Sequence, residues 1–95
     1  MTIEYENAQH TSHAPDAVEL ARIGPGYVVK ICARGKPEVE NCFGERFWVL
    51  VHSVDGDTIT GQVDNHVMFH SLEFGEVITF KAENVYQIDG PIVRH

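Results

Sequence analysis

Hydrophobic and polar residues alternate along much of the chain after residue 26. In the segment 27–34, Tyr27, Val29, Ile31 and Ala33 occupy every second position. The positions between them include Lys30 and Cys32, so this second face is mixed. A period of two residues is typical of a β-strand that has one face in the core and one in water. We therefore expect a strand with Cys32 on its wet face.

The segment from 45 to 54 is apolar on both faces over its middle. One face carries Phe47, Val49 and Val51, and the other carries Trp48, Leu50 and Val54. A strand of this kind has to be covered on two sides, as a central strand is. The N-terminal helix is the first candidate for the second cover, and another molecule is the alternative.

Turn residues separate the remaining strand-like segments. Asp55-Gly56-Asp57 predicts a tight hairpin turn, and TITGQV alternates as a return strand with Gly61 at a bend. Leu72-Glu73-Phe74-Gly75 predicts another turn, EVITFKA a further strand, and ENVYQI a short 3-10 turn with an edge strand. The fold class expected from this spacing is mainly β (α+β), with a small antiparallel β-barrel or curled-sheet meander over 27–88.

The N-terminal part has a different pattern. Residues 1–12 are polar and show no sustained period, so we expect a flexible arm. Residues 14–23 carry apolar positions at helical spacing and end at Gly24-Pro25-Gly26, which predicts one α-helix capped by Ser12 or His13. With 95 residues, the chain has material for a single domain, 1–95.

Four segments, FWVLV, VDGDTITGQVDN, FGEVITF and NVY, resemble a group of uncharacterised small bacterial domains. The shared pattern is an aromatic-rich strand, a DGD-x-I-x-G hairpin and a G-E/D-x-V/I-x-F strand, and it covers Glu45 to Ile88. The resemblance implies a small cytoplasmic β-domain and assigns no catalytic residue. Some similar domains look like immunity proteins encoded beside secreted toxins, which implies an acidic surface that caps a basic toxin.

The charge balance narrows the classes of partner. The formal charge is −7, from 14 acidic and 7 basic residues. This charge repels phosphate backbones and anionic lipid, so we expect neither nucleic-acid nor membrane binding and favour a basic protein partner. The opening segment MTIEYENAQH lacks the pattern of a secretory signal, so we expect a cytoplasmic protein in which Cys32 and Cys42 are free thiols.

Six histidines and two cysteines raise the possibility of a zinc site. The pairs with close spacing are His10 with His13 and His66 with His70, to which Cys32 or Cys42 could be added. No CxxC motif is present, and the first pair lies in and directly after the expected arm. We therefore expect no metal and no cofactor.

Two catalytic arrangements can be imagined from the sequence. Cys32 with His52 and Asp64 would form a thiol nucleophile, its base and an orienting acid. Nothing around Cys32 resembles the surroundings that lower a thiol pKa. Asp55, Asp57 and Asp64 could act as paired acids, but turn chemistry explains them. We expect no enzyme activity.

Protein binding is the function that these observations favour. The expected contact residues are Trp48 and Leu50 on the second face of the central strand, with Glu38 and Glu40 in the polar 35–44 loop. The hypothesis is a non-catalytic interaction module, immunity-like or regulatory, with a basic partner. A small metal- or thiol-dependent enzyme using Cys32, Cys42 and histidines, and a structural homodimer, are the alternatives.

Overall fold

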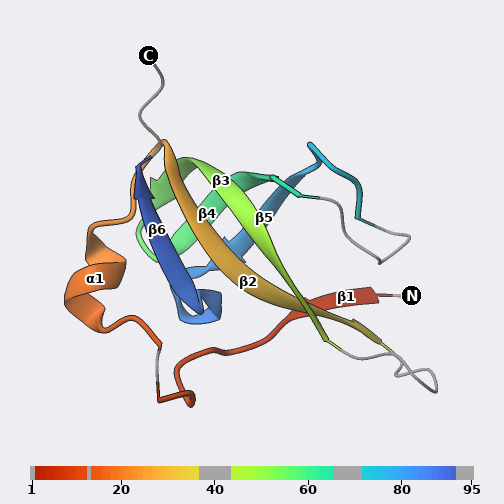
Figure 1. Cartoon of the computed structure of the whole chain (residues 1–95), viewed down its shortest axis with the longest axis horizontal. Helices are drawn as coiled ribbons and strands as arrows, with labels where there is room; N and C mark the ends of the chain where they lie inside the picture. Colours follow the sequence, from red (N-terminus) through yellow and green to blue (C-terminus); the bar gives the residue numbers. More distant parts are fainter. Residues whose placement is uncertain (1, 13, 37–43, 66–71, 92–95) are drawn as a thin grey trace.

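The computed structural model describes residues 2–12, 14–36, 44–65 and 72–91 (Figure 1). In chain order the elements are β1 (Thr2–Tyr5), α1 (Ala17–Ala21), β2 (Tyr27–Lys36), β3 (Glu45–Asp55), β4 (Thr58–Val63), β5 (Val77–Lys81), the 3-10 helix η1 (Ala82–Asn84) and β6 (Gln87–Pro91). The fold is therefore mainly antiparallel β. No helix within these ranges combines the length and the apolar character needed to cross a membrane.

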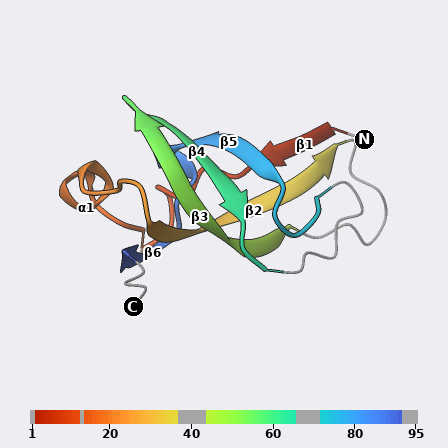
Figure 2. The same ribbon diagram turned by 90° about the horizontal axis from the view of Figure 1, so that it is seen from above.

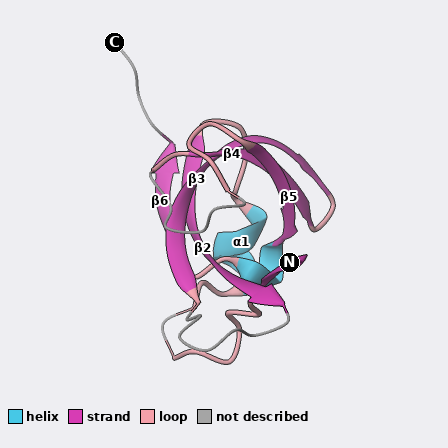
Figure 3. Cartoon of the chain, turned by 90° about the vertical axis from the view of Figure 1, so that its right-hand side faces the viewer, coloured by secondary structure: helices cyan, strands magenta, loops and turns pink. Residues whose placement is uncertain are grey.

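The strands form one strongly curved sheet in the order β1-β2-β3-β4-β5. β2 is long enough to pair with β1 through its second half and with β6 through its first half, while β3 pairs with its other edge. Figure 3 looks along the resulting barrel-like sheet, with the strands around the interior and α1 at the far end. The expected meander of consecutive antiparallel strands is confirmed for β2 to β5.

The core lies inside the curved sheet and follows the alternation in the sequence. Its largest fully buried side chains are Val29, Ile31, Phe47, Val49, Val51, Ile59, Val63 and Val85. At Gly61 on β4, a methyl group would lie 2.6 Å from the carbonyl oxygen of Leu50 and 2.6 Å from Cγ1 of Val49. β3 and β4 can therefore approach closely only because position 61 has no side chain.

The predicted helix over 14–23 is much shorter in the structure. Only residues 17–21 are helical, and Asp16 provides the cap in place of Ser12 or His13. The Asp16 carboxylate accepts from the backbone N–H of Glu19, and the Glu19 carboxylate accepts from the N–H of Asp16, as in a capping box. Leu20 and Ile23 pack against the interior core. The helix lies at one end of the barrel, away from the start of β1 (Figures 1 and 2).

The expectation of a flexible arm over 1–12 is wrong for its first half, because Thr2–Tyr5 pairs with β2 as strand β1. The chain stays attached beyond β1, where the N–H of Glu6 donates to Cys32 O at 2.9 Å and the N–H of Ala8 donates to Glu83 O at 2.8 Å. The side chain of Ala8 is fully buried. Local sequence did not reveal this strand because its partner lies about thirty residues away in the sequence.

The closing segment after β5 agrees with the prediction of a 3-10 turn and an edge strand. The buried side chain of Asn84 joins this turn to both ends of the sheet. Its amide donates to Tyr5 O at 3.2 Å and to Glu6 O at 3.0 Å, and its oxygen accepts from the N–H of Lys81 at 2.8 Å. Among the described residues no ladder joins β1 directly to β5, so Asn84 connects the two strands where the backbone does not.

Candidate functional site

The turn that leads into β5 exposes apolar side chains between carboxylates. Phe74 is 56% exposed and Val77 is 59% exposed, while Glu73 and Glu76 on the same turn are also exposed. Leu72 immediately before them is buried in the core. We call residues 73–77 the acidic turn.

Backbone hydrogen bonds fix the shape of the acidic turn. The N–H of Gly75 donates to Val63 O at 2.8 Å, and the N–H of Val63 donates to Glu76 O at 2.9 Å. A third bond runs from the N–H of Glu76 to Glu73 O at 3.0 Å. Gly75 has φ of 86°, a conformation that favours glycine. These bonds therefore fix the backbone that carries Phe74.

Further acidic residues lie at the same end of the barrel. The charge of Glu76 adds to burial in raising the pKa of the Tyr5 hydroxyl on β1. Glu4 lies on β1, and Glu45 is the first residue of β3, opposite Ala33. From the sequence, residues 72–75 were predicted only as a turn, and Phe74 was not among the expected contact residues. The sequence signal for an exposed contact residue was an aromatic residue in a turn, at a position where a polar residue is usual, with a glutamate on each side.

The outer surface of the β2–β3 pair carries a second group with the opposite charge. The ammonium Nζ of Lys30 lies 4.7 Å from the ring centroid of Trp48. The guanidinium carbon of Arg46 lies 4.4 Å from the ring centroid of Tyr86. Both contacts have the geometry of cation–π interactions. We call Lys30, Arg46, Trp48 and Tyr86 the basic strip.

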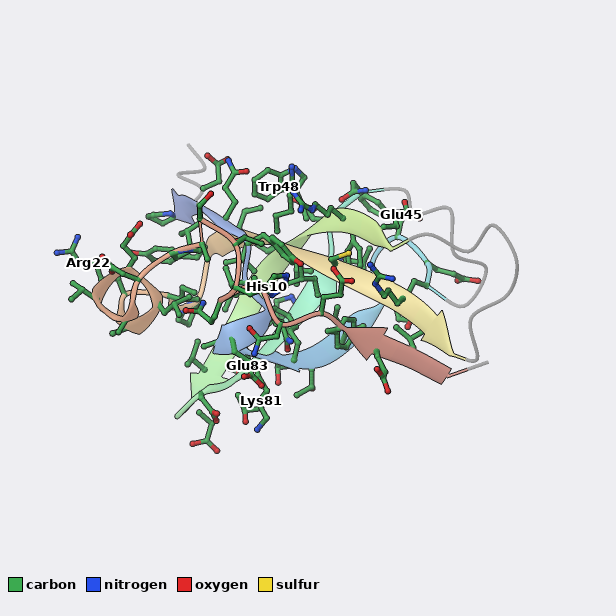
Figure 4. The ribbon with its side chains drawn as sticks, turned by 90° about the horizontal axis from the view of Figure 1, so that it is seen from below. His10, Arg22, Glu45, Trp48, Lys81 and Glu83 are labelled. Atoms are coloured by element: carbon green, nitrogen blue, oxygen red, sulfur yellow. The ribbon has the colours of Figure 1, made fainter. Side chains whose placement is uncertain are left out.

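Trp48 and Leu50, the residues expected to bind a partner, are half-buried on this outer surface. Figure 4 shows Trp48 on the opposite side of the barrel from Lys81 and Glu83. The contacts of α1 are with the interior core through Leu20. The proposed cover of the Trp48 face by the helix is therefore not what the structure shows. The other two expected contact residues, Glu38 and Glu40, lie outside the described residues.

Cys32 lies beneath the basic strip and is not on a wet face. It is 3% exposed and forms a small cluster with Ala8 and Tyr86. Ala8 and Tyr86, which cover Cys32, are distant from it in sequence. The local alternation could not show this cover, so it predicted that Cys32 faces water. A methyl group at Gly44 would lie 2.9 Å from its Sγ atom.

Glu6 accepts hydrogen bonds from the groups around Cys32. Its carboxylate pairs with the guanidinium of Arg34 and accepts from the hydroxyl of Tyr86 at 2.9 Å. Burial raises the pKa of Glu6, but hydrogen bonds from Tyr86, Arg34 and Cys32 outweigh it, so the pKa lies below its usual value. Burial and the bond to Glu6 raise the pKa of Cys32 to about 11 and that of Tyr86 to about 12.

The structure does not bring the imagined thiol triad together. Cys32 is opposite Arg46 on β3, and His52 lies six residues further along that strand, which corresponds to about 20 Å. The Nε2 atom of His52 lies 3.2 Å from the side-chain oxygen of Gln62. Asp64 lies beside Trp48, where its N–H donates to Trp48 O at 2.9 Å. Because its pKa is raised, the Cys32 thiol stays protonated near neutral pH, when it is a poor nucleophile.

Most residues of the imagined zinc site lie outside the described part of the chain, namely Cys42, His13, His66 and His70. Within the described part, no three His, Cys, Asp or Glu residues are grouped as metal ligands would be. Asp55 and Asp57 occupy the β3–β4 turn with Gly56, whose φ is 63°, in agreement with the turn interpretation.

Comparisons with protein-family models, with curated proteins and with solved structures each returned no match.

Proposed function

We propose that this chain is a non-catalytic protein-interaction module that binds a basic protein partner through the acidic turn. The observation that carries this proposal is the exposure of Phe74 and Val77 on a hydrogen-bonded turn between Glu73 and Glu76. An exposed aromatic side chain on a rigid support is a common anchor of protein interfaces.

The negative charge around the acidic turn also supports a basic partner. The carboxylates of Glu73 and Glu76 flank the apolar pair, and the whole chain has a formal charge of −7. Such a surface increases the rate of encounter with a positively charged protein and repels acidic ones. Phe74 and Val77 would then contribute buried apolar area once the surfaces meet.

The non-catalytic part of the proposal is supported by the state of Cys32. Its thiol is buried and hydrogen-bonded, with a pKa of about 11, and the histidine and aspartate of the imagined triad lie elsewhere. An immunity-like role, in which the module caps a basic toxin, or a regulatory role would both use the acidic turn in this way.

The test is affinity capture with the immobilised chain. A lysate of the cells that produce the chain is passed over the wild type and over the Phe74→Ser variant, at about 50 mM and about 500 mM salt, and bound proteins are identified by mass spectrometry. We expect one basic protein to bind the wild type at low salt. Its recovery falls at high salt, and the Phe74→Ser variant lowers it at least about tenfold.

Val18→Ser is the matched control, because Val18 is 64% exposed but lies on α1 at the other end of the barrel. It is expected to leave the recovery unchanged. Equal loss with both variants would refute the assignment to the acidic turn. Recovery that does not depend on salt would remove the electrostatic part of the proposal. Light scattering over a dilution series separates this outcome from a homodimer.

A further inference from the structure

In the part of the chain that the structure describes, the two cations of the basic strip have no carboxylate partner. Within the described residues, neither Lys30 nor Arg46 forms an ion pair, and each lies instead over an aromatic ring. Two other cations differ in this respect: Arg34 pairs with Glu6, and Nζ of Lys81 lies 3.6 Å from a carboxylate oxygen of Asp57. In a chain with 14 acidic and 7 basic residues, two neighbouring cations that meet no carboxylate among the described residues are unusual.

Strand register places both cations on the same surface. Lys30 on β2 is directly opposite Trp48 on β3, and the next pair on this face is Cys32 with Arg46. Directly opposite residues of an antiparallel pair point to the same side of a sheet. Because Arg46 and Trp48 are two residues apart on one strand, the successive pairs are separated by about 7 Å.

The aromatic rings hold the two cations but leave their polar edges available. A guanidinium or ammonium group over a ring face keeps N–H groups that point away from the ring. Those groups can donate charge-assisted hydrogen bonds to a carboxylate. Stacking also limits the rotamers of the long side chains, so less entropy is lost when a ligand binds.

We infer that the basic strip binds an extended acidic segment of a protein partner, with carboxylates at alternate positions. In an extended chain every second side chain points the same way at a spacing of about 7 Å, which is close to the spacing of roughly 7 to 8 Å between diagonal cross-strand neighbours such as Lys30 and Arg46. Half-buried Trp48 and Leu50 provide apolar contact for the methylene groups of those acidic side chains.

A protein segment fits this surface better than a nucleic acid. A polyphosphate chain carries a charge at every nucleotide and extends past the strip toward the rest of a molecule with a formal charge of −7. A short acidic peptide places its charges only on the two cations. This inference goes beyond the proposed function, because the acidic turn and the basic strip are different surfaces with opposite charge.

Trp48 allows a direct test, since it is the chain's single tryptophan. The probe is a ten-residue peptide of alternating Glu and Thr, titrated while the emission of Trp48 is recorded. A control peptide of the same composition, EETTEETTET, has no two glutamates two positions apart and so tests the spacing. We expect a saturable change in emission, with the alternating peptide binding at least about tenfold more tightly than this control peptide.

Lys30→Gln and Arg46→Gln are each expected to weaken binding at least about tenfold, whereas Lys30→Arg retains it. Lys81→Gln is the matched control, because it removes a cation from the other side of the barrel (Figure 4) and is expected to change nothing. Thermal melting establishes that each variant is folded before it is titrated, and the charge-conserving Lys30→Arg separates lost charge from lost packing.

Four results would overturn the inference. The alternating peptide could leave the emission unchanged up to millimolar concentration, or it could bind the two Gln variants as tightly as the wild type. A ten-residue oligothymidylate that binds more tightly than the peptide would assign the strip to nucleic acid. Scattering that increases with protein concentration in the absence of peptide would assign it to a second copy of this chain.

Discussion

The acidic turn and the basic strip present apolar and charged groups in opposite ways. On the turn, Phe74 and Val77 extend into solvent and the carboxylates stand beside them. On the strip, the rings of Trp48 and Tyr86 lie partly or fully buried and the cations lie over them. The turn therefore resembles a surface that inserts into a partner, and the strip resembles a flat surface on which a segment can lie.

This comparison shows that net charge does not describe the individual surfaces of a small β-protein. The formal charge of −7 is the same for any arrangement of these residues. Register and alternation decide that Lys30, Trp48 and Arg46 share one outer face. The contact of Arg46 with Tyr86, which is distant in sequence, completes this face.

The largest expected effect comes from a change that loosens the support of both regions. Gly61→Ala would place a methyl group 2.6 Å from the carbonyl oxygen of Leu50 in β3, so the β3–β4 pair must separate. We expect the free energy of unfolding to fall by about 2 to 3 kcal/mol, measured by urea denaturation. In Gly24→Ala a methyl group meets no atom within 4 Å, so this control is expected to change stability by less than about 0.5 kcal/mol.

A smaller effect, away from the acidic turn, is expected from Asn84→Ala. This variant loses the three hydrogen bonds that connect η1 to β1 and β5, at a cost of about 2 kcal/mol. Amide exchange is expected to become faster at Glu6, which donates to Cys32, and to stay slow at Val63, which holds the acidic turn. Equal acceleration at both amides would contradict the separation of the two regions.

Tyr86 of the basic strip, with Cys32 and Glu6 beneath it, should make the free energy of unfolding depend on pH. The folded pKa of Cys32 is about 11 and that of Tyr86 about 12, both above their ordinary values. The folded state therefore holds these protons more tightly, and its stability is lost as pH rises from about 9 through the folded values. For Glu6, with a lowered pKa, stability is lost as pH falls through its folded value.

Urea denaturation from pH 3 to pH 11 measures this dependence. Cys32→Ala is expected to flatten the alkaline limb, and Glu6→Gln the acidic limb. An alkaline limb that is unchanged in Cys32→Ala would contradict the assignment to this thiol.

The smallest effect is expected at the control position of the strip experiment. Lys81 and Asp57 form an exposed pair at 3.6 Å, and exposed pairs contribute little to stability. Lys81→Gln is expected to lower the free energy of unfolding by less than about 0.5 kcal/mol in urea denaturation. A larger loss would disqualify it as a control.

Much of the fold could be predicted because the alternation of apolar and polar residues in the sequence matches the alternation of buried and exposed side chains in the strands. The inner residues of β3 and β4 and the glycine turn between them are where the sequence places them. β1 was not predicted, because Ile3 and Tyr5 alternate with polar residues over only four positions, and the pairing with β2 is what makes this segment a strand. The helix was predicted too long because its apolar spacing continues past the residues that α1 includes; Val18, in its middle, is exposed.

The site was less predictable than the fold. Trp48 and Leu50 were recognised as apolar residues on a second face, but Lys30 over Trp48 depends on cross-strand register. Phe74 was missed because a turn explained its neighbours. The burial of Cys32 depends on Ala8 and Tyr86, which are distant in sequence, so no local pattern could indicate it.

The most direct test of the central claim, that two surfaces of opposite charge act independently, is the Trp48 titration with the alternating peptide on three proteins. The account predicts that Phe74→Ser binds the peptide as the wild type does and that Lys30→Gln binds it at least about tenfold more weakly. A Phe74→Ser variant that loses the peptide as completely as Lys30→Gln would contradict it.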